Sequence, residues 1–174
     1  AAKEATQTLI DDNRKNILLL TSEDYVSVGN LRTEGYLEAL KDNDIIPDSD
    51  LIIKVKDKKG SELEMSHLED ELEKVLITKK VDAILGVNEI YAGSAIKVLK
   101  KNKISVPKEI SIISFTDGVI SRYSSPSLST ISQHGEIMGE RSAKLLINKL
   151  TGKTESNQYK TEIIYCSLIK RESS

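Results

Sequence analysis

Cysteine, histidine and tryptophan are scarce or missing in this sequence, which limits the chemistry that it can support. The 174 residues include one cysteine, two histidines and no tryptophan. A single cysteine cannot form an internal disulfide, and Cys166 lies in a strand-like run where we expect a small core residue. The composition offers no cluster of cysteines and histidines for a metal centre. We therefore expect neither a metal nor a cofactor.

Long apolar runs and an excess of positive charge are also missing. No apolar run approaches the roughly 20 residues that cross a bilayer, and the first residues lack the layout of a secretory signal. The formal net charge is −2, and the basic stretches 54–59 and 97–101 are short and interrupted. Because nucleic acids are bound by clustered Lys and Arg, we do not expect this segment itself to bind them. We expect a globular chain that makes no contact with a membrane.

Familiar catalytic motifs fail on position or spacing. Residues 151–154 look like the end of a phosphate-binding loop, but they follow a helical segment, and the earlier glycine would fall at Ile147. No G-x-G-x-x-G follows the first predicted strand, and no G-x-S-x-G is present. His67 is expected at the surface of a Glu-rich helix, whereas His134 is a candidate for the border of a pocket. The sequence predicts that the protein is not an enzyme.

The pattern of apolar residues indicates an α/β fold. Short β-branched or Leu-rich runs alternate with longer amphipathic segments, and an Ala/Leu stripe at 2–10 continues a helical pattern. Strands that are apolar at consecutive positions belong in a sheet covered on both faces, and strand-helix-strand order implies parallel crossovers. The sequence therefore predicts a doubly wound parallel sheet. The predicted strands are 16–21, 51–55, 82–86, 111–115 and 162–168, and the predicted helices are 28–41, 63–79, 89–102 and 136–150.

Polar residues follow three of the predicted strands. In an open parallel sheet, ligands bind at the carboxyl ends of the strands. Carboxylates, amides and an Arg fork can pair with vicinal hydroxyls, so such a lining suits a polyol. Asn88 and Asp117 have an alternative role, since both residue types often cap helices. The candidate residues of this site are Tyr25, Arg32, Asn88, Glu89, Thr116 and Asp117.

Short segments also follow one another in an order that is typical of one family. They are the Ala-x-x-Leu-Ile helix before Ile17–Thr21, Arg32–Tyr36 with Leu40, Ile45–Pro47, Asp82–Ile84 before Asn88-Glu89, Ile104–Pro107, Ile110–Ile113, Pro126–Ile131, Gln133, Met138-Gly139 and Leu168–Ser173. This order resembles the effector-binding core of the lactose-repressor and galactose-repressor family of bacterial transcription regulators, which share a fold with periplasmic sugar-binding proteins. The resemblance covers nearly the whole chain.

The resemblance implies which residues face the effector. Arg32, Asn88 and the Thr116-Asp117 pair would do so, with Gln133 at the crossover between two lobes. The sequence departs from the family at two positions, because Thr116 stands where Asp is common and Glu89 where Asp is usual. An effector that depends on a carboxylate at position 116 is therefore in doubt.

The resemblance also implies how the chain is organised. Residues 1–132 and 162–174 would form the C-terminal lobe, and residues 133–161 a fragment of the N-terminal lobe whose helix 136–150 lacks much of its packing surface. The DNA-binding helix-turn-helix would lie outside this chain. A homodimer is implied as well, through the helix 90–101 and the loop 121–124, with Tyr91, Ser94 and Leu99 at the interface.

Three functions follow from these expectations. The first is the core of a cytoplasmic transcription regulator in which a small effector, expected to be a sugar, shifts the affinity of a dimer for operator DNA. The second is a periplasmic sugar-binding protein of a transport system. The third is an enzyme on a similar α/β domain, which no catalytic constellation supports because fold alone does not confer function.

Overall fold

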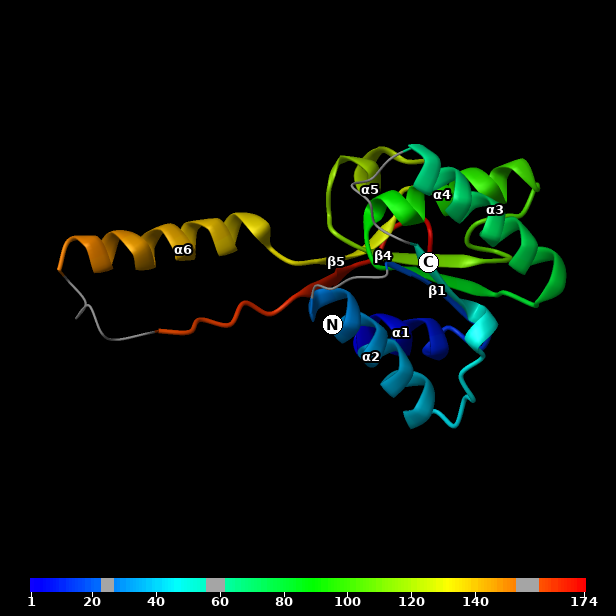
Figure 1. The fold of residues 1–174 in the computed structure, drawn as a ribbon, viewed down its shortest axis with the longest axis horizontal. Helices are drawn as coiled ribbons and strands as arrows, with labels where there is room; N and C mark the ends of the chain where they lie inside the picture. Colours follow the sequence, from blue (N-terminus) through cyan, green and yellow to red (C-terminus); the bar gives the residue numbers. More distant parts are fainter. Residues whose placement is uncertain (23–26, 56–61, 153–159) are drawn as a thin grey trace.

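The structure is a computed structural model that describes residues 1–22, 27–55, 62–152 and 160–174. Tyr25, one of the predicted effector contacts, lies outside the described residues. The described residues form a six-stranded sheet with the order β2-β1-β3-β4-β5-β6 (Figure 1). The first five strands are parallel, and β6 is antiparallel to β5. The strands are β1 (Ile17–Ser22), β2 (Ile52–Val55), β3 (Ala83–Gly86), β4 (Ser111–Phe115), β5 (Ser129–Ser132) and β6 (Ser167–Ile169).

Helices cover both faces of the sheet, which confirms the predicted doubly wound fold. One face carries α1 and α2, which pack against each other, and the opposite face carries α3, α4 and α5 (Figure 1). A short 3-10 turn, η1 (Ser49–Leu51), precedes β2. The helices are α1 (Ala2–Asp11), α2 (Ser27–Asp42), α3 (Glu62–Thr78), α4 (Glu89–Lys101), α5 (Val119–Tyr123) and α6 (Gly135–Leu150).

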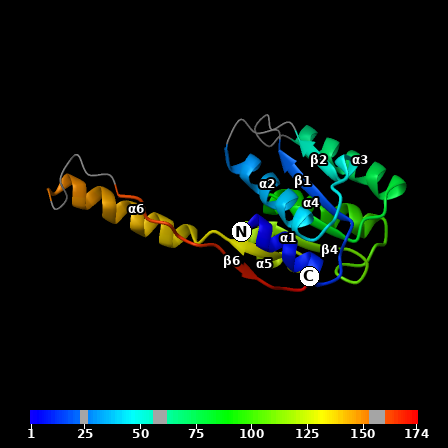
Figure 2. The same cartoon turned by 90° about the horizontal axis from the view of Figure 1, so that it is seen from below.

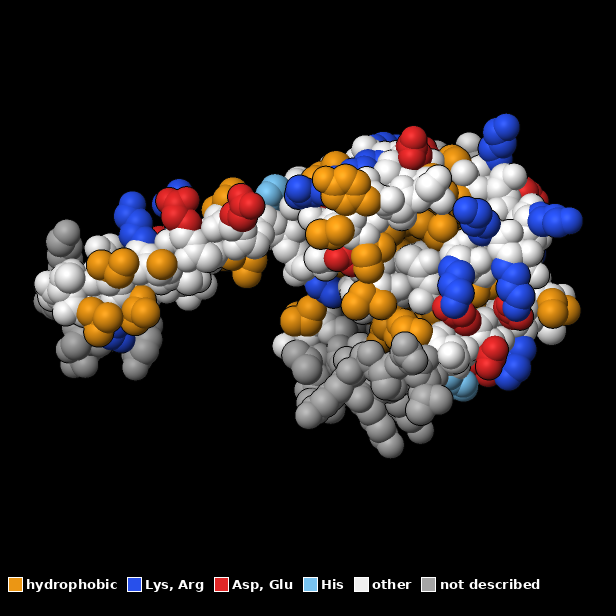
Figure 3. Space-filling model, turned by 90° about the horizontal axis from the view of Figure 1, so that it is seen from above, with side chains coloured by type: hydrophobic (Ala, Val, Ile, Leu, Met, Phe, Trp, Pro, Cys, Tyr) orange, Lys and Arg blue, Asp and Glu red, His pale blue; other side chains and the backbone are white. Residues whose placement is uncertain are grey.

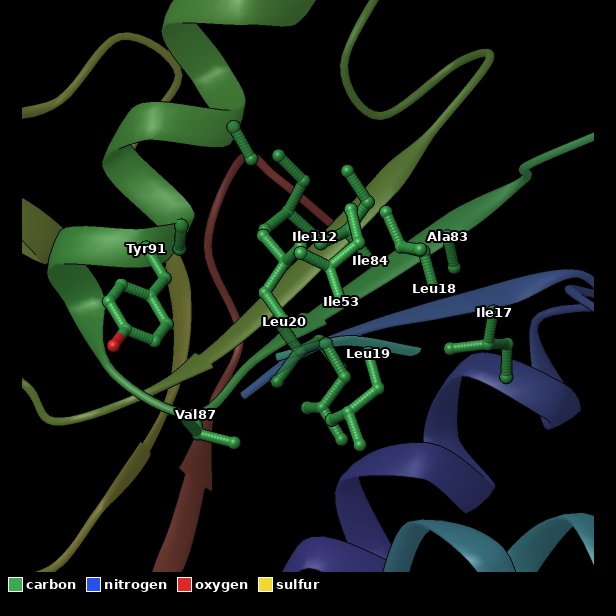
Figure 4. Packing of buried hydrophobic residues seen from close by; sticks show 14 of the residues in the cluster. Ile17, Leu18, Leu19, Leu20, Ile53, Ala83, Ile84, Val87, Tyr91 and Ile112 are labelled. Atoms are coloured by element: carbon green, nitrogen blue, oxygen red, sulfur yellow. The ribbon is translucent and has the colours of Figure 1, made fainter. Parts of the chain in front are cut away.

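The central strands are buried on both faces because their side chains are apolar at consecutive positions. Ile17 to Leu20 of β1 are at most 1% exposed. Figure 4 shows how these residues meet apolar side chains of β2, β3 and β4, and how Tyr91 of α4 lies beside them. Burial of a Leu or Ile side chain stabilises a fold by about 1.5–3 kcal/mol. The core therefore holds the carboxyl ends of β1, β3 and β4 in fixed relative positions.

Two elements escaped the sequence prediction, and one was wrongly bounded. β5 and the five-residue α5 were not expected as a strand and a helix. The last strand was expected at 162–168, but only Ser167–Ile169 pairs with the sheet. Residues 162–166 are β-like in composition, yet they run beside α6, where no described strand is available as a partner (Figure 2).

α6 extends away from the body of the molecule. Figures 1 and 2 show it projecting beyond β5, with residues 160–166 returning alongside it. All of its residues are described and none is buried. Its exposed apolar side chains are Ile137, Met138, Leu146, Ile147 and Leu150. The helix therefore presents an apolar surface that the described chain does not cover.

Among the described residues, none of the helices combines the length and the apolar character that crossing a membrane requires.

Candidate functional site

A hollow of about 510 Å³ opens at the carboxyl end of β4. Thr116, Asp117 and Arg122 line it from the loop and helix after β4, and Gln133 and His134 from the segment that leads into α6. The structure thus brings three predicted site residues, Thr116, Asp117 and Gln133, to one place. The hollow is also lined by Ser132, Gly135, Glu136, Ile137 and Ile169.

Asp117 is held by two arginines. Its Oδ1 accepts a hydrogen bond from Arg171 Nη2, and its Oδ2 lies 3.0 Å from Arg122 Nη2. Arg171 also donates to Thr130 Oγ1 at 3.0 Å and to the Leu128 carbonyl at 2.7 Å. The Asp117 side chain is 13% exposed, so its charge needs these partners. The carboxylate therefore ties the loop after β4 to α5 and to the end of β6.

The arginines also set the charge state of Asp117. Burial by itself raises the pKa of the carboxyl, but the hydrogen bonds and charges of Arg171 and Arg122 outweigh burial and hold the pKa below its ordinary value. Asp117 is therefore ionised at neutral pH. Its two oxygens already accept hydrogen bonds from side chains of the same chain.

Thr116 has an unusual backbone. Its φ of 77° lies in the left-handed region, which is unfavourable for a β-branched residue. Its N–H donates to the Ile131 carbonyl at 3.2 Å, and its carbonyl accepts from Ser121 Oγ at 2.9 Å. The side chain is exposed and faces the hollow. Strained residues of this kind gather at functional sites, where the surroundings hold them.

Arg32 lies at the same edge of the sheet, between β3 and β4. Its Nη1 donates to the Val87 carbonyl at 2.6 Å, and its guanidinium carbon lies 4.2 Å from the centre of the Phe115 ring. A cation over an aromatic face is attracted by the ring quadrupole. Arg32 is therefore anchored beside the strand that ends in Thr116, although it is not among the residues that line the hollow.

Asn88 and Glu89 both have local structural partners. The Asn88 side chain caps α4, since its Oδ1 accepts a hydrogen bond from the Tyr91 N–H at 2.9 Å. The alternative role weighed for Asn88 is therefore present. Glu89 accepts a hydrogen bond from the Ser121 N–H at 3.1 Å, and its Oε2 also lies 2.9 Å from Ser121 Oγ. Neither residue lines the hollow.

The three predicted dimer residues are partly or fully covered within the chain. Tyr91 is 5% exposed and Leu99 is fully buried within the chain, so neither side chain offers surface to a second copy. Ser94 is half-buried, and its Oγ lies 3.7 Å from Met65 Sδ. Helical periodicity shows which residues lie on the same face of α4. It does not show which faces are covered by the sheet and by α3.

Exposed apolar side chains gather elsewhere on α4 and α5. Figure 3 shows hydrophobic side chains grouped over this part of the surface. Gly93 of α4 packs closely against α5, because a Cβ at this position would lie 3.2 Å from Ile120 Cγ2. The exposed apolar residues are Ile90, Val119, Ile120 and Tyr123.

The two histidines have different surroundings. His67 is exposed on α3, as expected. His134 lines the hollow, and its Nε2 lies 3.0 Å from Ser167 Oγ, so it joins the segment entering α6 to β6. Within the described part of the chain, no group of three or more His, Cys, Asp or Glu residues is placed to hold a metal ion.

Sequence reasoning missed the two arginines of the site. Arg171 was noticed only as part of the closing Leu168–Ser173 segment, and Arg122 carried no signal. Arg171 pairs with a residue 54 positions earlier in the chain, a separation at which no sequence pattern indicates contact. The short α5 that presents Arg122 was itself not expected.

Comparison with known proteins places this geometry in context. The family described as periplasmic binding protein-like domain matches residues 6–174. The HTH-type transcriptional regulator MalR of Clostridium butyricum is 32% identical over 174 residues, which is 99% of this chain and 49% of MalR. The HTH-type transcriptional regulator GalR of Salmonella typhimurium (strain SL1344) is 30% identical over 171 residues, which is 97% of this chain and 47% of GalR.

A solved structure has the same fold. The transcriptional regulator CelR in complex with cellobiose matches with a TM-score of 0.82 at 24% identity, covering 99% of this chain and 51% of CelR. The chain spans about half the length of the curated relatives that it matches.

Proposed function

Because this chain belongs to the periplasmic binding protein-like domain family, in the lactose-repressor and galactose-repressor (LacI/GalR) group of transcription regulators, we propose that it forms the effector-binding core of a regulator. The effector is a sugar or a related polyol. The relatives named above are regulators, so a role in transport or in catalysis is not favoured.

The observation that carries the proposal is the open hollow at the carboxyl end of β4. Thr116, Gln133 and His134 offer hydroxyl, amide and imidazole groups there, and such groups pair with sugar hydroxyls. Arg122 and Asp117 add a charged pair at the rim. CelR, a protein of the same fold, was solved with cellobiose, which makes cellobiose a suitable first probe.

The proposal includes two lobes. Residues 1–132 and 162–174 form one lobe, and residues 133–161 belong to a second lobe whose remainder comes from sequence outside these residues. The unburied apolar side of α6 supports this division, since a helix normally buries its apolar face against a neighbour. The effector then lies between the lobes, against Thr116 on one side and the incoming segment Gln133–Glu136 on the other.

The mechanism is linkage between two binding events. An effector that contacts both lobes favours the closed arrangement, and it shifts DNA affinity only as far as its affinity differs between the two states. Contact with operator DNA comes from a segment outside these residues, and the regulator acts in the cytoplasm where that DNA lies. We propose that this regulator acts as a homodimer. Its contact surface is formed by the exposed residues Ile90, Val119, Ile120 and Tyr123.

Thermal unfolding of the full-length protein tests the proposal. Cellobiose, maltose, galactose, ribose and adenosine are added separately, each at a large excess. A ligand at about 100 times its Kd stabilises the folded state by about 2.7 kcal/mol, which raises the melting temperature by about 3–5 °C for a protein about twice the length of this chain. A variant with Thr116→Val, which keeps the side-chain shape and removes the hydroxyl, serves as the matched control and is expected to respond less. No response to any member of the panel would count against the proposal.

A further inference from the structure

Glu89 follows the capping residue of α4, but its carboxylate serves a different helix. Its Oε2 accepts a hydrogen bond from the Ser121 N–H at 3.1 Å and lies 2.9 Å from Ser121 Oγ. Ser121 is fully buried in α5. Hydrogen bonds to a charged acceptor are about twice as strong as neutral ones, so Glu89 fixes the position of α5 relative to α4.

Gly118 provides the space for this contact. A Cβ built at Gly118 would lie 2.7 Å from Glu89 Cδ, closer than real Cβ atoms approach a neighbour. The φ of Gly118 is −93°, which other residues also adopt. A side chain at this position would therefore push the Glu89 carboxylate out of its place beside the Gly118 Cα. We call Glu89, Gly118 and Ser121 the Glu89 clamp.

The Glu89 clamp acts on Thr116. Ser121 Oγ lies 2.9 Å from both the Thr116 carbonyl and Glu89 Oε2, and its single proton can be donated to only one of these acceptors at a time. The Ser121 N–H donates to Glu89 Oε2 at 3.1 Å, so the carboxylate holds Ser121 in place while the hydroxyl can donate to the Thr116 carbonyl. Thr116 has a φ of 77° and an exposed side chain. Because no packing of that side chain holds the strained backbone, the conformation depends on hydrogen bonds to the Thr116 N–H and carbonyl.

We propose that Glu89 is a positioning residue of the effector site: through Ser121 it holds Thr116 and Asp117 in their binding arrangement without touching the effector. The inference rests on the proposed function, because it assumes that the hollow beside Thr116 receives the effector. Glu89 does not line that hollow. Its carboxylate is therefore a determinant of affinity that a search for contact residues overlooks.

Hydrogen exchange in the full-length protein tests the clamp itself. Four variants are compared with the parent: Glu89→Ala, Gly118→Ala, the double variant, and Glu89→Gln. Loss of a hydrogen bond to a charged group is expected to speed exchange in the segment 116–122 by about tenfold. Gly118→Ala is expected to do the same, because its methyl group displaces the carboxylate. The double variant is expected to exchange no faster than Glu89→Ala. Glu89→Gln, whose neutral amide oxygen still accepts from Ser121 but more weakly than a carboxylate, is expected to fall between Glu89→Ala and the parent.

Amide hydrogen exchange in β1, at residues 17–22, distinguishes a local loss of positioning from a loss of stability of the whole fold. It is expected to stay unchanged in all four variants. Faster exchange throughout the protein, additive effects in the double variant, or an unchanged 116–122 segment in Glu89→Ala would overturn the proposal.

Calorimetry with cellobiose supplies the functional readout. Glu89→Ala and Gly118→Ala are expected to bind about tenfold more weakly, with Glu89→Gln between Glu89→Ala and the parent. Unchanged cellobiose affinity in Glu89→Ala, together with faster exchange at 116–122, would overturn the role in affinity. If the parent binds neither cellobiose nor any other member of the panel, the proposed function loses support, while the exchange experiment still decides whether the Glu89 clamp holds Thr116.

Discussion

Asp117 is the residue on which three parts of the molecule converge. It lies in the loop after β4 and pairs with Arg122 of α5 and with Arg171 beyond β6. A largely buried carboxylate without partners would be costly. With two arginines it is instead a fixed junction between the hollow and the segment that returns from α6.

The pairing of Asp117 predicts a pH-dependent loss of stability. Because the pKa of Asp117 is lower in the folded state than its ordinary value of 3.8, its contribution is complete above that value and disappears as the pH falls through the lower, folded-state pKa. Asp117→Asn is expected to lower the free energy of unfolding by about 2–3 kcal/mol at pH 7. The difference between parent and variant is expected to shrink at acid pH, as measured by urea unfolding between pH 7 and pH 3.

Asp70→Asn is the matched control for this experiment. Asp70 is exposed on α3, so its replacement is expected to change stability by less than about 0.5 kcal/mol at any pH. An Asp117→Asn variant that lost the same stability at pH 3 as at pH 7 would contradict the assigned ion pairs.

Residue identity alone predicted part of this chemistry. Asn88 was weighed as a helix cap, and it caps α4 through a contact three residues away. Glu89 was expected at the ligand, but its partner Ser121 lies 32 residues later in the chain. Local contacts follow from helix geometry, whereas distant partners depend on how the strands are ordered in the sheet.

α6 is the element whose surroundings are least complete. Its apolar side chains Ile137, Leu146 and Ile147 are exposed, although an apolar stripe on a helix normally faces a core. The expectation that this helix lacks packing surface came from its sequence resemblance. In the structure the helix projects from the sheet and none of its residues is buried (Figure 2).

Leu146→Ala tests whether α6 gains a partner in the longer protein. In the 174-residue chain the substitution is expected to change the free energy of unfolding by less than about 0.5 kcal/mol, because Leu146 is 59% exposed. In the full-length protein, burial of α6 against the second lobe would raise the cost to about 2–5 kcal/mol. Leu99→Ala, in the core, is the control and is expected to cost about 2–5 kcal/mol in both. Equal small effects of Leu146→Ala in both chains would contradict the two-lobe proposal.

Elements with a clear apolar pattern were predicted well, and those without one were not. β1 and β4 are apolar at consecutive positions and were found within one residue. β5 has the sequence Ser-Thr-Ile-Ser, and its polar groups are buried because they form hydrogen bonds with the C-terminal segment. The Ser129 N–H, for example, donates to Ser173 Oγ at 2.8 Å. No local pattern indicates a strand that is completed from 44 residues away.

At the scale of the whole molecule, the exposed apolar surface on α4 and α5 bears on assembly. Tyr123 is 83% exposed and lies with Val119 and Ile120 on the same short helix. Clustered apolar residues on a surface often mark an interface with another protein. In the proposed homodimer this surface meets its copy across a two-fold axis.

Tyr123→Asp is expected to weaken the dimer, as measured by sedimentation velocity of the full-length protein over a range of concentrations. Central aromatic residues of an interface often contribute at least 2 kcal/mol, so the dissociation constant is expected to rise by about 30-fold or more. Ile46→Asp, at a position that is 90% exposed before Pro47, is the control and is expected to leave the dimer intact. A parent that sediments as a monomer, or a Tyr123→Asp dimer as tight as the parent, would rule out this surface.

The sequence by itself determined the fold class and the edge of the sheet where the hollow lies, because apolar periodicity is a local pattern. It also indicated the family, because short segments follow one another in the order that the family shows. Only the tertiary structure decided that Leu99 and Tyr91 are core residues, that Glu89 serves α5, and that Arg171 and Arg122 neutralise Asp117. These outcomes depend on which segments the sheet brings side by side. Burial and ion pairing between distant residues arise from that arrangement, so they cannot be assigned until the strands are in place.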